Sequence, residues 1–404
     1  MTAEVYLYDA PDQRDLFLPF SLSRPLGELR YGAFLLRERW ATILGHPVAG
    51  HLAAAHLADF AEPGAPPVVL RPGSPHIPRF VFLSTFVPAP DAAIPADAAE
   101  GLRFVDSGGA LVGLALPRRV EWTGWNAPAS WPSVTLPGER LAGVWDLIGH
   151  LPRVLAADLE RLRAEHGEPS VPRGVTVLGD PSLVVVGEAA VEPQVVLDVR
   201  KGPIVLAPGV EVRALTRLAG PLAVARDTRV VGGQISASAI GPRCVVRGEM
   251  TNCVFLGYAN KAHDGFLGHS VVGRWVNIGA GTITSNLKNT YGPVRLVLHG
   301  VRRDTGLTNL GTLFGDHVKT AIGTFLPTGC VVGVGANLFG STRPPTEVTP
   351  FTWGLDAPGP VLEAGRFVEV AERVLPRRDV VVDDAMRRYL AAVWGAATRE
   401  TPCG

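Results

Sequence analysis

Aliphatic residues return at every sixth position along the second half of the chain. Strict steps of six connect Leu206, Val212, Leu218, Val224 and Val230. The step recurs later, often with a glycine directly after the aliphatic residue, at Ile240, Val272, Ile278, Ile322 and Val334. A half-buried strand alternates with period two, whereas three six-residue steps make one triangular coil of about 18 residues. The pattern predicts a parallel β-helix over residues 171–355.

The six-residue phase is broken once and then ends. Residues 284–312 are rich in Asn, Gly and other polar side chains, which predicts a loop projecting from a coil. The repeat stops after Pro350, and residues 356–404 are predicted to be a tail with a helix at 384–397. Because the open end of a solenoid leaves backbone groups unpaired, we expect this helix to cap it.

The first part of the chain has a different pattern. Short apolar runs at 5–8, 68–70 and 80–83 alternate with Pro and Gly turns, and a helical spacing lies between about 29 and 44. These features predict an α/β domain over residues 1–138, and the Pro- and Trp-rich stretch 126–138 is typical of a linker. Apolar spacing from 141 to about 165 predicts one amphipathic helix, so residues 139–170 form a connecting helix and linker.

Composition narrows the class of partner. The 38 Lys and Arg residues balance 38 Asp and Glu residues, so no global basic field exists for nucleic acid. We find no run of 18 apolar residues and no secretory signal, and the four cysteines have neither metal-ligand spacing nor a paired pattern. We therefore expect a soluble, cytoplasmic protein that binds neither nucleic acid nor membrane.

The strings NKAHDGFLGHSVVG and NIGAGTIT, which begin at Asn260 and Asn277, carry a family resemblance. Over about residues 205–340 the chain resembles the acetyltransferase half of the bifunctional N-acetylglucosamine-1-phosphate uridyltransferase/glucosamine-1-phosphate acetyltransferase family. The resemblance implies that the β-helix is left-handed. It also implies a nucleotidyltransferase-like N-terminal α/β domain, which is degenerate in its phosphate loop.

The resemblance assigns catalytic roles to His263 and Glu249. An ammonium group has no lone pair with which to attack a thioester, so the reaction needs a base that titrates near neutral pH. His263 matches that base, and Glu249, fourteen residues earlier, matches the family's glutamate that would orient the ring. His269 is a competing base, although its position favours a structural role.

The resemblance also implies binding residues. The sugar phosphate would contact Asn277, Asn286 and Phe266, and acetyl-CoA would lie along Ala280, Ala321 and Ile322. Two positions depart from the family, because Phe266 stands for a tyrosine and Thr251 for a lysine. Another cation must then hold the phosphate, and the candidates are Arg213, Arg217, Lys261 and Lys288.

The N-terminal part lacks the glycine-rich phosphate loop that nucleotidyltransferases place after their first strand. Arg24 and Arg30 are the candidates for nucleotide binding, and Asp9 and Asp106 for a Mg²⁺ site. The implied second activity is uridylyl transfer from UTP.

The resemblance thus implies acetyl transfer from acetyl-CoA to an amino-sugar 1-phosphate, with glucosamine 1-phosphate favoured and UDP-N-acetylglucosamine as the coupled product. A homotrimer with active sites between subunits is expected, because flat solenoid sides bury apolar surface against copies of themselves.

Two alternatives stay open. One is a sugar-1-phosphate nucleotidyltransferase whose β-helix is only structural or regulatory. The other is a silent scaffold or a zinc-dependent hexapeptide enzyme, for which a third suitably spaced histidine is missing.

Overall fold

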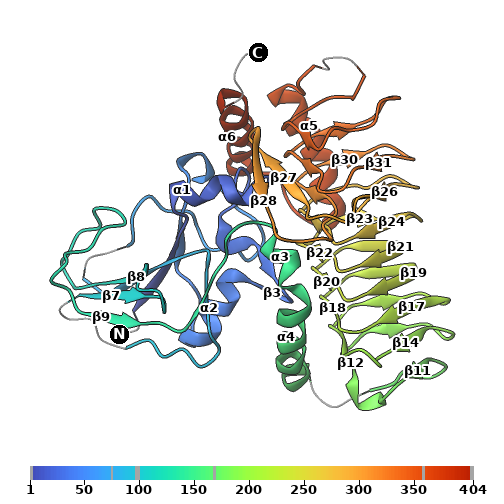
Figure 1. Ribbon diagram of the computed structural model, residues 1–404, viewed down its shortest axis with the longest axis horizontal. Coiled ribbons are helices and arrows are strands. Elements are labelled where there is room, and N and C mark those ends of the chain that lie inside the picture. The colour runs from blue at the N-terminus through green and yellow to red at the C-terminus, as the bar shows by residue number, and fades with distance from the viewer. Residues whose placement is uncertain (1–2, 74–75, 96–100, 167–169, 357–359, 401–404) are drawn as a thin grey trace.

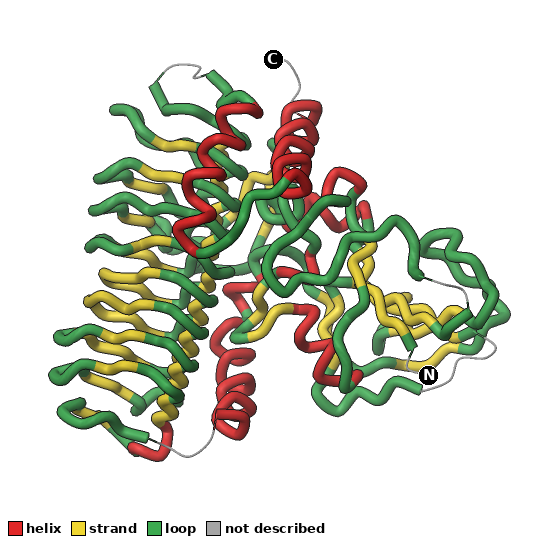
Figure 2. Tube along the Cα trace, turned by 180° about the vertical axis from the view of Figure 1, so that it is seen from behind, coloured by secondary structure: helices red, strands yellow, loops and turns green. Residues whose placement is uncertain are grey.

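The computed structural model describes residues 3–73, 76–95, 101–166, 170–356 and 360–400, and Cys403 lies outside these ranges. Figure 1 shows an α/β part on one side and a tall stack of coils on the other, with α3 and α4 between them. The view from behind, in Figure 2, shows the same two parts in contact along the stack. None of the described helices has the length and apolarity needed to cross a lipid bilayer.

A six-stranded sheet, in the order β4-β1-β5-β8-β7-β9, organises the N-terminal part. Its strands are β1 (Glu4–Tyr8), β4 (Gly50–Leu52), β5 (Arg79–Leu83), β7 (Leu102–Val105), β8 (Leu111–Leu116) and β9 (Ser133–Thr135). Strands β1, β4 and β5 are parallel, and β8 is antiparallel to both of its neighbours. The predicted strands at 5–8 and 80–83 are confirmed, whereas Val68 forms only an isolated bridge to His51.

The predicted linker at 126–138 was wrong. This stretch supplies the edge strand β9, and β10 (Gly138–Arg140), which follows it, pairs with β6 (Phe86–Pro88). Trp131 within this stretch is a packing residue that lies over the backbone of Gly101, and Trp125 just before it stacks on Tyr8 with ring centroids 5.1 Å apart. In this proline-rich stretch the aromatic side chains therefore cover part of the sheet and do not mark a linker.

Helix α2 packs on one face of this sheet, and further helices connect the sheet to the coils. Short elements precede the connecting region: α1 (Pro11–Arg14), η1 (Asp15–Phe17), η2 (Leu26–Glu28), β2 (Arg30–Tyr31), β3 (Phe34–Leu35), α2 (Leu36–Leu44) and η3 (Ala55–Leu57). The single helix predicted from 141 to 165 is two, α3 (Asp146–Gly149) and α4 (Leu151–His166). The break falls at His150, directly before α4, whose second residue is Pro152; proline is tolerated in a first helical turn, where its missing N–H has no partner to lose.

The coils form a left-handed parallel β-helix with three faces. The open face contains β11 (Thr176–Leu178), β14 (Val196–Asp198), β17 (Thr216–Ala219), the ends of β19 (Arg229–Ser236) and β21 (Val245–Thr251), β24 (Phe266–Gly268), β26 (Ile283–Thr284) and β31 (Phe325–Leu326). The short-strand face contains β13 (Ala190–Val191), β16 (Glu211–Val212), the starts of β19 and β21, β23 (Asn260–Lys261), β30 (Lys319–Thr320) and β33 (Asn337–Leu338).

The third, covered face is a nine-stranded sheet that packs against the rest of the chain. Its strands are β12 (Val184–Val186), β15 (Ile204–Leu206), β18 (Leu222–Val224), β20 (Ala239–Ile240), β22 (Val254–Phe255), β25 (Val271–Val272), β29 (Leu313–Phe314), β32 (Val331–Val332) and β34 (Glu347–Val348). A 3-10 turn, η4 (Pro181–Leu183), leads into the first of them.

The residues in steps of six from Leu206 to Val230 all point into the solenoid core, as predicted. The later phase was wrong at Ile322, which is 80% exposed at a corner. The inward positions there are Phe314, Leu326, Val332 and Leu338, which keep the step but sit two residues out of phase with Ile322. A glycine after an aliphatic residue marks a tight turn as readily as an inward strand position.

The middle coils are shorter than the 18 residues expected. Leu313 pairs with Val331, 18 residues on, but Val246 pairs with Lys261 after 15 and Glu249 with Phe266 after 17. Strands β19 and β21 run continuously from the short-strand face to the open face, so the extra corner residues are absent. Gly248 makes this possible, with a φ of 102° and the carbonyl oxygen of Gly265 where a side chain would be.

The predicted loop at 284–312 contains a β-hairpin. Strands β27 (Arg295–Leu298) and β28 (Val301–Asp304) pair antiparallel, and Leu296 and Leu298 join the buried cluster on the covered face. Helices α5 (Ala364–Val374) and α6 (Asp384–Glu400), separated by η5 (Leu375–Arg378), follow the last coils. The predicted terminal helix exists, but it does not cap the solenoid: Tyr389 packs on Phe60 and donates a hydrogen bond to the carbonyl of Ser23.

A buried ionic cluster joins the N-terminal part to the β-helix. Arg24 donates to Glu62 (2.9 Å) and Asp316 (2.9 Å), and Arg274 pairs with Glu62 at 2.7 Å. Asp316 also accepts hydrogen bonds from the Ser23 hydroxyl and from the backbone N–H of Arg274. Two guanidinium groups face two carboxylates with almost no exposure, so each charge depends on the others for compensation.

We predict that Asp316→Asn lowers the free energy of unfolding by about 3–5 kcal/mol, because it leaves Arg24 buried with too little negative charge. Denaturant unfolding of the full chain measures this. Arg388→Gln, which breaks the exposed Arg388–Asp59 pair, is the control and should unfold close to the wild type. An Asp316→Asn midpoint equal to that of the control would show that the cluster does not hold the two parts together.

Candidate functional site

His263 lies at a corner between the short-strand face and the open face, in the turn between β23 and β24. We call this turn, residues 262–265, together with residues 279–282 and 321–324 stacked on it, the His263 corner. The N–H of Gly281 donates to the backbone carbonyl of Asp264 (2.8 Å), and the N–H of Gly323 donates to that of Ala280 (2.7 Å). The three turns therefore lie on successive coils. His263 is exposed, and the predicted acyl-donor positions Ala280, Ala321 and Ile322 follow it up the same edge.

Glu249 and Phe266 are neighbours on the open face, paired in register between β21 and β24. Both point outward, because Met250 and Leu267 beside them fill the solenoid core. The N–H of Glu249 donates to the carbonyl of Gly265 at 3.0 Å, two residues after His263. The structure therefore brings the predicted pair Glu249 and His263 onto adjacent coils, although the described residues contain no hydrogen bond between the two side chains.

An apolar strip continues from Phe266 along the open face. Phe266 pairs with Ile283, and Ile283 pairs with Phe325. Ile283 is 41% exposed and Phe325 is 50% exposed. Two hollows of about 290 and 90 Å³ adjoin this strip and share Phe325, Arg343 and Pro344. Ala321 and Ile322 line the smaller one, and the guanidinium of Arg343 lies over the Phe325 ring. Because Arg343 lies beside the apolar strip, this region suits a ligand that has both an apolar arm and phosphate groups.

Asn286 lies at the other edge of the open face, stacked with His269 and Asn252 on successive coils. The amide of Asn286 is 2.7 Å from His269 Nδ1, and that of Asn252 is 3.1 Å from Nε2. A neutral imidazole donates from one nitrogen and accepts at the other, so one of the two amides presents its oxygen. Burial lowers the pKa of His269. With both nitrogens occupied, His269 is a poor candidate for the base, which leaves His263.

Lys261 is buried inside the His263 corner, and its predicted phosphate contact was wrong. Its ammonium donates to the backbone carbonyls of His263 and Arg247, and burial lowers its pKa to about 8. The side chain was predicted from its charge, but the strand alternation of β23 turns it toward the core. Lys261 therefore supports the turn that presents His263.

Arg213 and Arg217 do not reach Phe266 within one chain. Arg217 is three strand spacings away, through Gln234 and Glu249, which is about 14 Å. It is also paired with Asp198 at 2.6 Å. Arg213 lies in the exposed turn between β16 and β17, on the same coil as Arg217.

Sequence reasoning missed Arg247, which is paired with Asp264 at 3.0 Å on the His263 corner. Arg247 and Asp264 are 17 residues apart, which is also the interval between Glu249 and Phe266. This shared interval is the sequence signal that could have identified Arg247.

Asn277 lies on the short-strand face, so within one chain it faces away from Phe266 and Asn286. It is exposed and accepts a hydrogen bond from the Asn260 amide at 2.7 Å. This is a ladder of asparagines along neighbouring coils, which leaves the other side of the Asn277 amide open.

The predicted nucleotide and metal residues are not assembled into a site. All nitrogens of Arg24 are committed to the buried ionic cluster, and Arg30 faces the β-helix. Asp9 is buried and accepts from Ser84 and Leu26 N–H, and burial raises its pKa. Asp106 holds its own turn through Gly108 and Ala110 and is three strand spacings, about 14 Å, from the end of β1.

Magnesium binds oxygen ligands at about 2.1 Å, so Asp9 and Asp106 cannot share one ion. Within the described ranges no group of three or more His, Cys, Asp or Glu side chains could hold a metal. Asp9 and Asp106 thus do not form the shared Mg²⁺ site that was predicted for them.

Comparison with known proteins adds to this geometry. The family model for sugar nucleotidyl transferases matches residues 5–166. The chain is 31% identical over 91 residues to a bifunctional sugar-1-phosphate nucleotidylyltransferase/acetyltransferase of Sulfurisphaera tokodaii. It is 30% identical over 122 residues to the bifunctional protein GlmU of Methanococcus vannielii. Over these parts of its length, the chain is similar to a sugar nucleotidyl transferase domain and to bifunctional GlmU-like proteins. These matches span 22% and 29% of the chain and only 23% and 28% of the two GlmU-like proteins.

We predict that Lys261→Met changes how stability depends on pH. Between about 8 and the ordinary value of 10.5, the folded state binds fewer protons at Lys261 than the unfolded state, so wild-type stability rises with pH. The free-energy difference between wild type and Lys261→Met should therefore shift in favour of wild type across this window. Denaturant unfolding at both ends of the window measures it, and exposed Lys201→Met is the control. Parallel pH profiles for all three proteins would mean that the Lys261 amine is not buried.

Proposed function

We propose that the β-helix transfers an acetyl group from acetyl-CoA to the amine of an amino-sugar 1-phosphate, with glucosamine 1-phosphate as the first substrate. The observation that carries this proposal is the open face itself. His263 lies at one edge, Glu249 and Phe266 lie side by side on the face, and Asn286 lies at the other edge. A sugar phosphate laid across this face would have its amine at the base and its ring against Phe266.

In the proposed reaction His263 removes a proton from the substrate amine, whose nitrogen then attacks the thioester carbonyl carbon. The new C–N bond replaces the C–S bond, and coenzyme A leaves as a thiolate that takes up a proton. General base catalysis of this kind is worth about 10²–10⁴ in rate. Glu249, on the adjacent coil, would stabilise the imidazolium that forms.

The donor would use the apolar strip and the edge of the His263 corner. Its pantetheine arm would lie along Ala280, Ala321 and Ile322, and Arg343 would face its phosphates. On the acceptor side, Arg247 at the corner and Lys288, two residues after Asn286, are the cations that replace the missing tyrosine and lysine. This assignment replaces that of Arg213 and Arg217, because Arg247 lies on the His263 corner and Lys288 closely follows Asn286 in the chain.

A homotrimer completes this proposal. The covered face is occupied by the chain itself, so the open and short-strand faces are left for another copy. Asn277 and Asn286 lie on different faces of one chain. A neighbouring copy that presents its short-strand face would bring its Asn277 to the sugar, which places the site between subunits.

A second candidate is sugar-1-phosphate nucleotidyl transfer, favoured by the family match over residues 5–166. In this alternative UTP and a magnesium ion would bind the N-terminal part, and the β-helix would be structural or regulatory. The absent glycine-rich loop and the separation of Asp9 from Asp106 weigh against it.

We predict that His263→Ala lowers kcat for coenzyme A release by about 10²–10⁴, with oligomeric state unchanged. Thiol release from acetyl-CoA and glucosamine 1-phosphate measures the rate. His299→Ala, in the hairpin between β27 and β28, is the matched control and should retain wild-type turnover.

Undiminished turnover in His263→Ala would remove this residue from the mechanism. Pyrophosphate release with UTP and Mg²⁺ separates the two candidates. Pyrophosphate release that survives His263→Ala, in a chain that never releases coenzyme A, would establish nucleotidyl transfer instead.

A further inference from the structure

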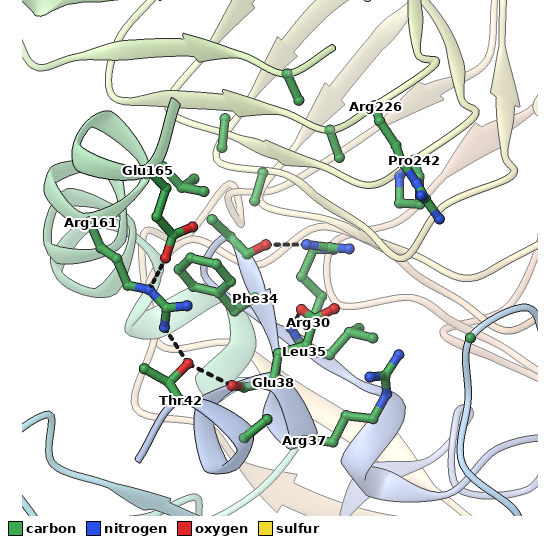
Figure 3. Close-up of a pocket in the computed structure, with 18 of the residues that line it drawn as sticks. Arg30, Phe34, Leu35, Arg37, Glu38, Thr42, Arg161, Glu165, Arg226 and Pro242 are labelled. Carbon is green, nitrogen blue, oxygen red and sulfur yellow. Dashed lines mark hydrogen bonds and ion pairs between the residues drawn. The ribbon is translucent and has the colours of Figure 1, made fainter. Parts of the chain in front are cut away.

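A cavity of about 1060 Å³ lies between the N-terminal part and the β-helix, away from the open face. Helices α2 and α4 form one wall, and strands and turns of the covered face form the other. Figure 3 shows Arg30 between these walls, with Thr42 and Arg161 on the helices and Arg226 and Pro242 on the β-helix. Among the described residues that line it, none comes from the six-stranded sheet, so the cavity is separate from the edge where Asp9 and Asp106 lie.

The cavity has more positive than negative charge. Its lining includes five arginines and two glutamates: Arg30, Arg37, Arg161, Arg226, Arg274, Glu38 and Glu165. Three of the arginines have a carboxylate partner within 2.7 Å, in the pairs Arg37–Glu28, Arg161–Glu165 and Arg274–Glu62. Arg30 and Arg226 have no ion pair within the described part of the chain.

Arg30 is the decisive residue, because its side chain is buried and, among the described residues, it forms no direct ion pair; Glu38 and Asp158 act on its charge only from a distance. The residue is 6% exposed. One terminal nitrogen donates to the carbonyl of Ala33, while Nε has no hydrogen-bond partner. Burial lowers the pKa of this guanidinium. A buried cation without a directly hydrogen-bonded counter-charge is costly, so an anion bound in the cavity would stabilise it.

The β-helix wall is flat and apolar. Val205, Ala223 and Ala239 point outward from neighbouring strands of the covered face, and Ala207 and Ala225 continue the surface. Strand spacing of about 4.8 Å and small side chains leave a smooth floor on which a ring can lie. Phe34 borders the cavity on the helix side, with the Arg161 guanidinium stacked 4.4 Å from its centroid.

We propose that this cavity binds a phosphate monoester with a planar organic part. Arg30 and Arg226, from opposite walls, contact the phosphate, and the ring lies on the alanine floor. Guanidinium groups suit phosphate because their planar donors match its oxygens in pairs. A ligand held from both walls links the N-terminal part to the β-helix, separately from the acetyl-transfer site.

The test is calorimetric titration of the full-length protein with AMP, compared with glucose 6-phosphate and inorganic phosphate. AMP should bind most tightly, since it alone presents both a phosphate and a planar ring. Arg226→Gln should weaken AMP binding about tenfold or more. Arg229→Gln removes the same charge from an exposed pair with Glu211 and is the matched control.

Arg226 belongs to the β-helix, so its effect distinguishes this cavity from a nucleotide site at the sheet edge. Arg30→Gln should weaken AMP binding as well; if that variant does not fold, Arg226→Gln still decides the question. Three results would overturn the proposal: no AMP binding at millimolar concentration, unchanged affinity in Arg226→Gln, or equal affinity for inorganic phosphate. Unchanged AMP binding by His263→Ala is also expected, which keeps this test independent of acetyl transfer.

Discussion

Burial of the covered face is the constraint on which the rest of the structure depends. A β-helix coil must point alternate side chains out of its core, and on this face those side chains are apolar. Segment 15–31, α3, α4 and the hairpin pack there, and the terminal helices belong to the same buried cluster. The same packing fixes which two faces stay exposed and draws the segment after β1 away from the sheet edge and onto the coils.

The repeat could be predicted from sequence because its cause is local. Leu206 to Val230 point inward at every sixth position, and any coil of this shape needs that step. Coil length could not be predicted, because Gly248 lets one strand run through a corner only when Gly265 of the next coil lies beside it. The fourteen-residue interval between Glu249 and His263 is a consequence of that corner.

The placement of the candidate residues could be predicted best where it depends on their position along the strands. Glu249, Phe266 and Asn286 share the open face because each occupies an outward position in the stack. Charge alone was a poor guide. Lys261 and Arg24 are both buried: Lys261 donates to the carbonyl of His263 in its own turn, whereas the partners of Arg24, Glu62 and Asp316, are set by tertiary contacts. Arg24 and Asp316 lie 292 residues apart in sequence, so no local pattern connects them.

The outward column of the covered face has a consequence for how the chain can be divided. Val185, Val205, Ala223, Ala239, Val254, Val271, Leu313 and Val331 form a continuous apolar ridge along the solenoid. A β-helix separated from the residues before it would expose much of that ridge to water, and contiguous apolar patches of this kind drive association. The β-helix therefore needs the N-terminal part to stay soluble. Splitting the gene between the two parts would be disfavoured for this reason, even if each part kept an intact site.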